Sequence, residues 1–426
     1  MLVDFKVTNF RSFKNEQEFS MQTGERLRKY NTSNTVKILS EKLLKSSLIF
    51  GANANGKTNL ILALATLKHV IMYPTSNIEQ ELNSDTFGNN DNSTKFEITF
   101  IRNQKKFYYF LEYTSLEVQK EILKVNERYI FKRQQQDFRL LPEQLIPIST
   151  NIRKNQLLLY FAQQNNEPNS NEAYLWFAQD LIFVDADNID SRRLKILSNQ
   201  DFKKQLLSFI QAADFDIIDI EVKKRKQNLP ELLYQIVQNQ NMEADEDQNV
   251  PEIPKQITVY DLFCKHRSKD NTFTLNLREE SRGTKIFINL ALYILENTNK
   301  VLLIDEFDMS YHFELANALV LLINNEIQSN QFILTTHNLP LMDSNLRQDQ
   351  IWFAEKNRYG ESELFSLFDF DDPALKRNDF NYKRRYLEGR YGATQMVNLN
   401  SILEILKENK FTSSEKAKLE KSSKNE

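Results

Sequence analysis

The chain has 426 residues, of which 41% are hydrophobic and 27% charged, and its formal net charge is −3. These values are typical of a soluble globular protein with one large domain or two, and they do not favour a strongly basic nucleic-acid binder. The single cysteine, Cys264, excludes an intramolecular disulfide, the N-terminus shows no secretory signal, and no apolar run is long enough to span a membrane. We therefore expect a cytoplasmic protein with no membrane partner.

The first third of the chain is predicted to consist mostly of strands. Strands are predicted at 2–13 (ending in a loop), 47–50, 96–101, 106–114, 116–125 and 128–131, and a helix at 57–72. The helix is indicated by apolar residues at helical spacing, and the strands by alternating apolar and polar residues. Because short turns separate the strands after residue 95, we expect them to form an antiparallel meander.

The rest of the chain is predicted to mix helices and strands. Residues 134–180, rich in Gln and Asn, are expected to be helical or irregular. Helices are then predicted at 199–212, 284–296 and 313–327, and strands at 216–224, within 257–278, and at 301–304, 332–336 and 351–354. We expect five segments: an N-terminal lobe (1–133), a mainly helical insertion (134–212), returning strands with an exposed acidic loop near 238–254 (213–280), a C-terminal lobe (281–411) and a flexible tail (412–426).

One motif matches the pattern GxxxxGK[ST] in full, between an apolar strand and a helix. It consists of Gly51, Ala52, Asn53, Ala54, Asn55, Gly56, Lys57 and Thr58. In such a loop the backbone N–H groups and the helix N-terminus hold phosphates, Lys57 reaches the β- and γ-phosphates, and Thr58 binds Mg²⁺. The chain has only 8 glycines, where ordinary usage gives about 30, so their presence in this loop is informative. The motif predicts ATP and Mg²⁺ as cofactors.

Two acidic residues follow the apolar strand at 301–304. A buried strand that ends in carboxylates directs them at a cation or a reacting group. We expect Asp305 to hold Mg²⁺ and Glu306 to orient and polarise the attacking water.

Two weaker patterns lie near these motifs in the sequence. Ser281 and Gly283 precede an apolar helix, where a Ser and a Gly can bind a γ-phosphate. His337 ends the predicted strand 332–336 and is expected to contact the γ-phosphate or to position water. Taken alone, the first pattern also fits an ordinary helix cap and the second a packed or solvated histidine.

Several other features keep two interpretations open. Residues 308–312 fit either an interface loop or a helix cap, and Arg11 fits either a nucleotide contact or a surface loop. The basic runs at 223–226 and 383–385 fit a solvated face better than a phosphate-binding patch. Glu355, Asp369 and Asp371 carry the carboxylates that a nuclease site needs, but they also suit a terminal pair of strands.

The order of these motifs, beginning with NFRSF at residues 9–13, resembles that of SMC/RecF-like ATPases of the ABC type. The chain more closely resembles the stand-alone ATPases of bacterial phage-defence operons, namely the RloA and AbiL type and the AriA component of PARIS. The stretches that carry this closer likeness are 212–224, 305–312, 351–370 and 386–395. The resemblance implies an α/β fold: an ABC-type P-loop NTPase head, with a mixed sheet plus an antiparallel N-terminal lobe, and a largely helical insertion between the P-loop and the signature.

The resemblance also implies a function. Two copies would bind ATP head to tail, with Ser281 and Gly283 as a shortened signature that engages the partner's nucleotide. ATP hydrolysis would let the chain sense infection and activate a separately encoded toxic effector, an RloB-like protein or a Toprim nuclease, in abortive-infection defence. The degenerate signature favours a switch over fast turnover.

Other functions also fit parts of the sequence. The main alternatives are a RecF-like DNA-repair ATPase, which the charge balance and the lack of a long coiled coil disfavour, and a scaffold that uses ATP with little hydrolysis. A transporter subunit would have a full LSGGQ signature. Nucleic-acid binding stays open.

Overall fold

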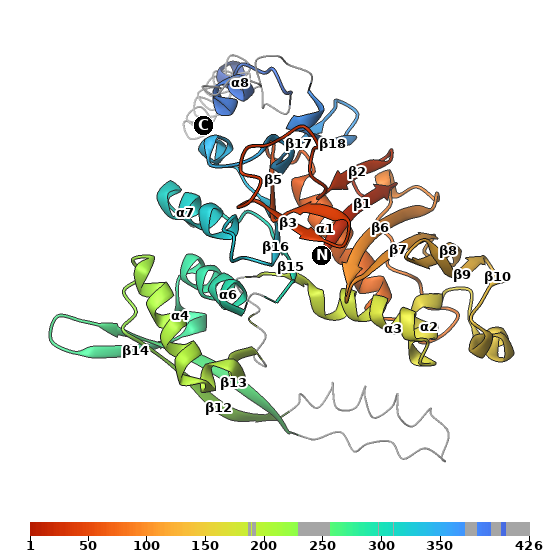
Figure 1. Cartoon of the computed structure of the whole chain (residues 1–426), viewed down its shortest axis with the longest axis horizontal. Coiled ribbons are helices and arrows are strands. Elements are labelled where there is room, and N and C mark those ends of the chain that lie inside the picture. Colours follow the sequence, from red (N-terminus) through yellow and green to blue (C-terminus); the bar gives the residue numbers. More distant parts are fainter. Residues whose placement is uncertain are drawn as a thin grey trace, which may run out of the picture.

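The computed structural model describes residues 1–185, 189, 193–228, 256–296, 298–309, 311–370, 381–392 and 402–405. Its centre is a six-stranded sheet in the order β11-β15-β16-β5-β17-β18, parallel except for the last pair (Figure 1). The strands are β5 (Ser46–Phe50), β11 (Leu181–Phe183), β15 (Val301–Ile304), β16 (Gln331–Thr335), β17 (Ile351–Lys356) and β18 (Ser362–Ser366). Every residue of β5, β15 and β16 is buried, as expected for strands covered on both faces.

Helices cover both faces of this sheet. On one face lies α1 (Lys57–Met72), whose Leu60, Leu64 and Leu67 share a core with alternate residues of β5 and β15. On the other face α6 (Arg282–Glu296) and α7 (Phe313–Ile323) pack on the remaining strand residues. The alternation of the strand side chains therefore divides the protein interior into two cores.

A second sheet of seven antiparallel strands, in the order β10-β9-β8-β7-β6-β1-β2, packs on the far side of α1. Its strands are β1 (Leu2–Thr8), β2 (Gln17–Ser20), β6 (Thr94–Arg102), β7 (Lys105–Tyr113), β8 (Val118–Val125), β9 (Arg128–Gln134) and β10 (Asp137–Leu140). The two sheets are tied together where the ring of Phe19 lies 4.9 Å from that of Trp352, and where the Gln331 side chain hydrogen-bonds the backbone of Leu2.

The remaining elements surround these layers. They are β3 (Thr35–Ile38) and β4 (Glu41–Leu44), which pair with each other, α2 (Leu158–Gln164), α3 (Pro168–Leu175), α4 (Gln200–Ala212), and α8 (Tyr382–Leu387). A three-stranded antiparallel sheet consists of β12 (Asp219–Asn228), β13 (Gln256–Arg267) and β14 (Thr272–Asn276). We call this sheet the arm, because Figure 1 shows it extending away from the two large sheets, with α4 lying along it.

The expected α/β fold class, with a mixed sheet and an antiparallel N-terminal lobe, is confirmed. The predicted helix at 57–72 and strand at 301–304 match their observed bounds, whereas α7 ends at Ile323 rather than at 327. The short strands β2, β3, β4, β10 and β11 were not predicted. The domain boundaries stay a prediction, although residues 134–212 contribute one strand to each large sheet. The expected acidic loop and tail lie outside the described residues, and no described helix is long and apolar enough to cross a membrane.

Candidate functional site

The loop between β5 and α1 needs its two glycines. Gly51 has a φ of 152°, and a Cβ there would lie 2.4 Å from the carbonyl oxygen of Ala354 in β17. Gly56 has a φ of 104°, and a Cβ there would lie 2.7 Å from the Oγ of Ser362. Side chains at either position would meet both backbone strain and a steric clash, so the loop's shape depends on these glycines.

Lys57 begins α1 and folds back over the loop. Its Nζ donates hydrogen bonds to the carbonyl oxygens of Gly51 at 2.8 Å and Ala52 at 3.0 Å. Burial lowers the pKa of Lys57 to about 8, and the charges of the nearby carboxylates of Asp305 and Glu306 only partly oppose this. The ammonium group is therefore short of counter-charge, which a phosphate group in the loop would supply.

Asp305 lies at the carboxyl end of β15, next to the end of β16. Its Oδ1 accepts hydrogen bonds from the hydroxyl of Thr58, at 3.3 Å, and from that of Thr335. The fold thus brings together Thr58 and Asp305, the two residues predicted to bind Mg²⁺. A hydroxyl and a carboxylate oxygen are ligands that suit this ion, which usually completes its shell with waters and substrate phosphates.

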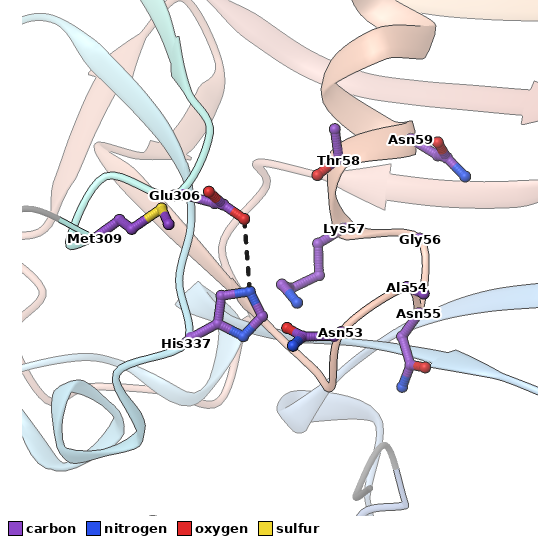
Figure 2. Close-up of a pocket in the computed structure, with 10 residues that line it drawn as sticks. All are labelled: Asn53, Ala54, Asn55, Gly56, Lys57, Thr58, Asn59, Glu306, Met309 and His337. Atoms are coloured by element: carbon purple, nitrogen blue, oxygen red, sulfur yellow. Dashed lines mark ion pairs between the residues drawn. The ribbon is translucent and has the colours of Figure 1, made fainter. Parts of the chain in front are cut away.

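Glu306 and His337 face each other across the same edge of the sheet. The Nε2 of His337 lies 3.9 Å from Oε1 of Glu306, and Figure 2 shows both side chains beside Lys57. The backbone of Glu306 is left-handed, with a φ of 50°, and its N–H donates to the Thr335 hydroxyl at 2.7 Å. Burial and the charge of Lys57 lower the pKa of His337, so the imidazole is neutral at pH 7 and can accept a proton.

These groups surround a cavity of about 620 Å³, within the range of small-molecule sites. Its lining consists of Asn53, Ala54, Asn55, Gly56, Lys57, Thr58, Asn59, Glu306, Met309 and His337 (Figure 2). The anion-binding loop, the acidic pair and the histidine, which are far apart in sequence, therefore meet at one site. This arrangement can hold a polyphosphate, neutralise it, and place a carboxylate and an imidazole next to it.

Ser281 and Gly283 do not line this cavity. Ser281 is exposed at the N-terminus of α6, where its Oγ accepts from the N–H of Thr284 at 3.1 Å. Gly283 is buried, and its carbonyl oxygen accepts from the hydroxyl of Tyr311. The structure therefore leaves the predicted signature outside its own chain's loop, with the Ser281 side chain capping the first turn of α6 through Thr284.

The residue before the signature is held by the arm. The Nε2 of His266, in β13, lies 2.6 Å from Oε1 of Glu280, and its Nδ1 lies 2.8 Å from the carbonyl oxygen of Asp216. Burial, and then the Glu280 carboxylate, raise the pKa of the Cys264 thiol to about 12. Glu280 is thus held by His266 of β13, an interaction that sequence reasoning missed because His266 lies outside the motif.

Sequence reasoning also missed two residues that support the loop. Thr335 bonds both Asp305 and the backbone of Glu306, although it belongs to the motif that pointed to His337. Ser12 accepts a hydrogen bond from Asn59 of α1 at 2.6 Å. By contrast, Arg11 does not line the cavity and pairs with Asp85 at 3.0 Å.

Of the carboxylates considered for a nuclease site, one has a structural role and another is not among the described residues. Asp369 caps a short turn, with its Oδ2 accepting from the N–H of Ser366 at 3.0 Å. Asp371 lies outside the described residues. Residues 351–370 do form the terminal pair of strands, β17 and β18, that was the competing interpretation.

Comparison with known proteins gives three findings. Residues 46–343 match the family described as "AAA domain, putative AbiEii toxin, Type IV TA system". A protein of Helicobacter pylori (strain ATCC 700392 / 26695), named "ATP/GTP phosphatase", is 22% identical over 404 residues, covering 91% of this chain and 97% of that protein. The SMC head domain from Thermotoga maritima aligns with a TM-score of 0.37 at 14% identity, over 86% of this chain and 98% of that one.

A further SMC head, solved bound to the C-winged helix domain of ScpA, aligns with a TM-score of 0.43 at 13% identity, over 88% of this chain and 99% of that one. The matched family covers well over half of the chain and includes the loop, the acidic pair and His337. The chain therefore belongs to the "AAA domain, putative AbiEii toxin, Type IV TA system" family, and it is a P-loop ATPase.

Proposed function

We propose that the chain hydrolyses ATP at sites shared by two head-to-tail copies. The observation that carries this proposal is the position of Ser281: it is exposed at the start of α6 and absent from the lining of its own chain's cavity. A second copy would bring its Ser281 and Gly283 to the γ-phosphate, where the helix N-terminus adds a favourable dipole.

Within such a site, each of these residues would have a separate role in ATP hydrolysis. The loop and Lys57 would hold the phosphates, and Thr58 and Asp305 would bind Mg²⁺, which would neutralise the charge that develops during transfer. Glu306 would orient and polarise the attacking water, while the neutral imidazole of His337 would contact the γ-phosphate or help to position that water.

Mixing two inactive variants tests the shared site. Lys57→Ala removes the phosphate-binding cation, and Ser281→Arg blocks the signature, so each alone should be inactive. In a mixture, the intact loop of one chain would meet the intact signature of the other, and ATPase activity should return. If the mixture stays inactive although the two variants associate, the sites are not shared.

We further propose that ATP turnover in this chain controls a separately encoded toxic effector in anti-phage defence. The toxin–antitoxin description of its family supports this proposal. An RloB-like protein or a Toprim nuclease is the expected partner, and a cytoplasmic location stays a prediction.

The genes beside this one offer the test of the effector role. Expressing the chain with each neighbouring gene should give phage protection that is lost in Glu306→Gln or Lys57→Ala. Protection that needs no neighbouring gene, or that survives both substitutions, would contradict the role. Survival after DNA damage that depends on the chain would favour the RecF-like alternative instead.

A further inference from the structure

The arm carries a run of basic residues, 223–226, in strand β12. The positive charges on the two faces of this strand differ in how many carboxylates lie near them. On one face of β12, Lys223 lies 3.5 Å from Glu221, and Arg225 pairs with Asp261. On the other face, Lys224 has no carboxylate within 4.0 Å among the described residues. Among the described residues, carboxylates therefore neutralise only one face of this run.

On the face without nearby carboxylates, Lys224 and a second lysine lie close to the same aromatic ring. Tyr260 of β13 pairs with Lys224 in register, and the Nζ of Lys224 lies 5.8 Å from the centre of its ring. The Nζ of Lys195 lies 5.5 Å from the same ring, and it too has no described carboxylate within 4.0 Å. Two exposed ammonium groups from separate segments thus converge on one half-buried tyrosine.

These residues line a cavity of about 390 Å³ between the arm and the start of α4. Its floor is apolar, formed by Leu194, Leu197, Ile220 and Val222. Lys203 also borders it but is held by Asp219 at 2.9 Å. Glu221, which is paired with Lys223, also lines the cavity. The cavity therefore combines an aromatic ring, an apolar floor and two lysines without a carboxylate within 4.0 Å among the described residues, and none of these belongs to the ATP site.

We propose that this cavity binds an unpaired nucleotide of a single-stranded nucleic acid, with the base against Tyr260 and the phosphate between Lys195 and Lys224. Base stacking on an aromatic side chain, combined with lysine–phosphate contacts, is how proteins bind single strands without sequence preference. A double helix keeps its base faces stacked inside and cannot offer one to the ring. An acidic peptide would use the lysines but leave the aromatic and apolar surfaces without a partner.

The net charge of −3 does not oppose this site, because a small number of local cations is enough to bind one or two phosphates. The site is also independent of the proposed ATP mechanism. Binding can therefore be measured in the full chain carrying Lys57→Ala and without ATP, so that the P-loop makes no contribution.

Fluorescence anisotropy with a labelled mixed-sequence single strand, as DNA and as RNA, tests the proposal. Lys224→Glu, Lys195→Glu and Tyr260→Leu should each weaken binding about tenfold or more. The matched control is Lys223→Glu, which makes the same charge change one residue away on the opposite face and should change affinity less than about threefold. Tyr260→Phe keeps the ring and should preserve binding, which separates loss of stacking from misfolding.

Competition against the labelled single strand identifies the kind of ligand that the site recognises. Unlabelled single strands should displace the probe, and displacement by uridine monophosphate as well would identify a mononucleotide site with the same chemistry. The proposal is overturned if the parent chain binds no single strand, if Lys223→Glu weakens binding as much as Lys224→Glu, or if duplex DNA or poly-glutamate competes as well as the single strand.

Discussion

Lys57 is a charged side chain held in a buried position before any phosphate is bound. Burial lowers its pKa to about 8 from the ordinary value of 10.5, so between these pH values the amine of the free protein is mostly neutral. Phosphate favours the charged form and raises this pKa again. ATP binding should therefore take up a proton in this pH window, and the effect should vanish below neutral pH, where the amine is already charged.

Calorimetry of ATP binding at about pH 8.5, in buffers with different ionisation enthalpies, measures this uptake. His337→Asn is the control, because the pKa of His337 is lowered and its ring is already neutral there. That variant should keep the uptake. A binding enthalpy that does not depend on the buffer at this pH would contradict the assigned role of Lys57.

Gly51 offers a second test at the scale of single residues. Gly51→Ala would place a Cβ 2.4 Å from the backbone oxygen of Ala354, whereas Gly88, also left-handed with a φ of 60°, has nothing within 4 Å of the same position. Both substitutions carry backbone strain, but only the first carries a clash. Gly51→Ala should lower the free energy of unfolding by about 1–3 kcal/mol more than Gly88→Ala. If urea denaturation showed equal losses of unfolding free energy for the two variants, the loop would be able to move and accommodate the new side chain.

At this scale, local motifs predicted residues that the fold brings together. Residues 53–58 of the loop, Glu306 and His337 line one cavity, and Asp305 contacts Thr58 beside it. Thr335 and Ser12 were missed because their roles come from contacts with residues distant in sequence. Local patterns name the groups that touch a ligand, but not the hydrogen bonds that hold those groups in place.

At the scale of elements, the arm and the signature are joined by one hydrogen-bonded pair. Both ring nitrogens of His266 face acceptors, the carbonyl of Asp216 and the carboxylate of Glu280. Each ring nitrogen therefore has one hydrogen-bond partner. Since Glu280 directly precedes Ser281, we expect this pair to position the signature for the partner's nucleotide.

Two substitutions at Glu280 distinguish loss of the hydrogen bond to His266 from loss of the negative charge alone. Glu280→Ala leaves His266 without its partner and should lower ATPase turnover about tenfold, with ATP affinity unchanged. Glu280→Gln can donate its amide N–H to a neutral ring nitrogen, so it should stay near wild-type turnover. Steady-state kinetics and an ATP-binding titration check both expectations, and full turnover in Glu280→Ala would exclude a positioning role.

The elements that sequence reasoning missed share a physical cause. The strands β2, β3, β4 and β10 have four residues each and β11 has three, too few to show a period. They form because a neighbouring strand supplies the hydrogen bonds, as β15 does for β11. The local sequence pattern is enough to predict a long periodic segment such as α1. Short edge strands form only by pairing with a neighbouring strand, so their own sequence does not predict them.

At the scale of the whole molecule, we propose that one chain carries only part of each working site. The P-loop, the acidic pair and His337 meet within a chain, but Ser281 stands apart from them on α6. Two copies related head to tail would complete two sites together. Such an assembly should form when ATP is bound and separate after hydrolysis, since the γ-phosphate is the group shared by the two chains.

The mass of Glu306→Gln in solution, measured by light scattering with and without ATP and Mg²⁺, tests this claim most directly. Loss of the carboxylate should slow hydrolysis by about a hundredfold or more and trap the bound state. We expect ATP and Mg²⁺ to double the mass, and the addition of Ser281→Arg to abolish the doubling while ATP still binds. An unchanged monomer mass with ATP bound, or doubling that survives Ser281→Arg, would contradict the shared site.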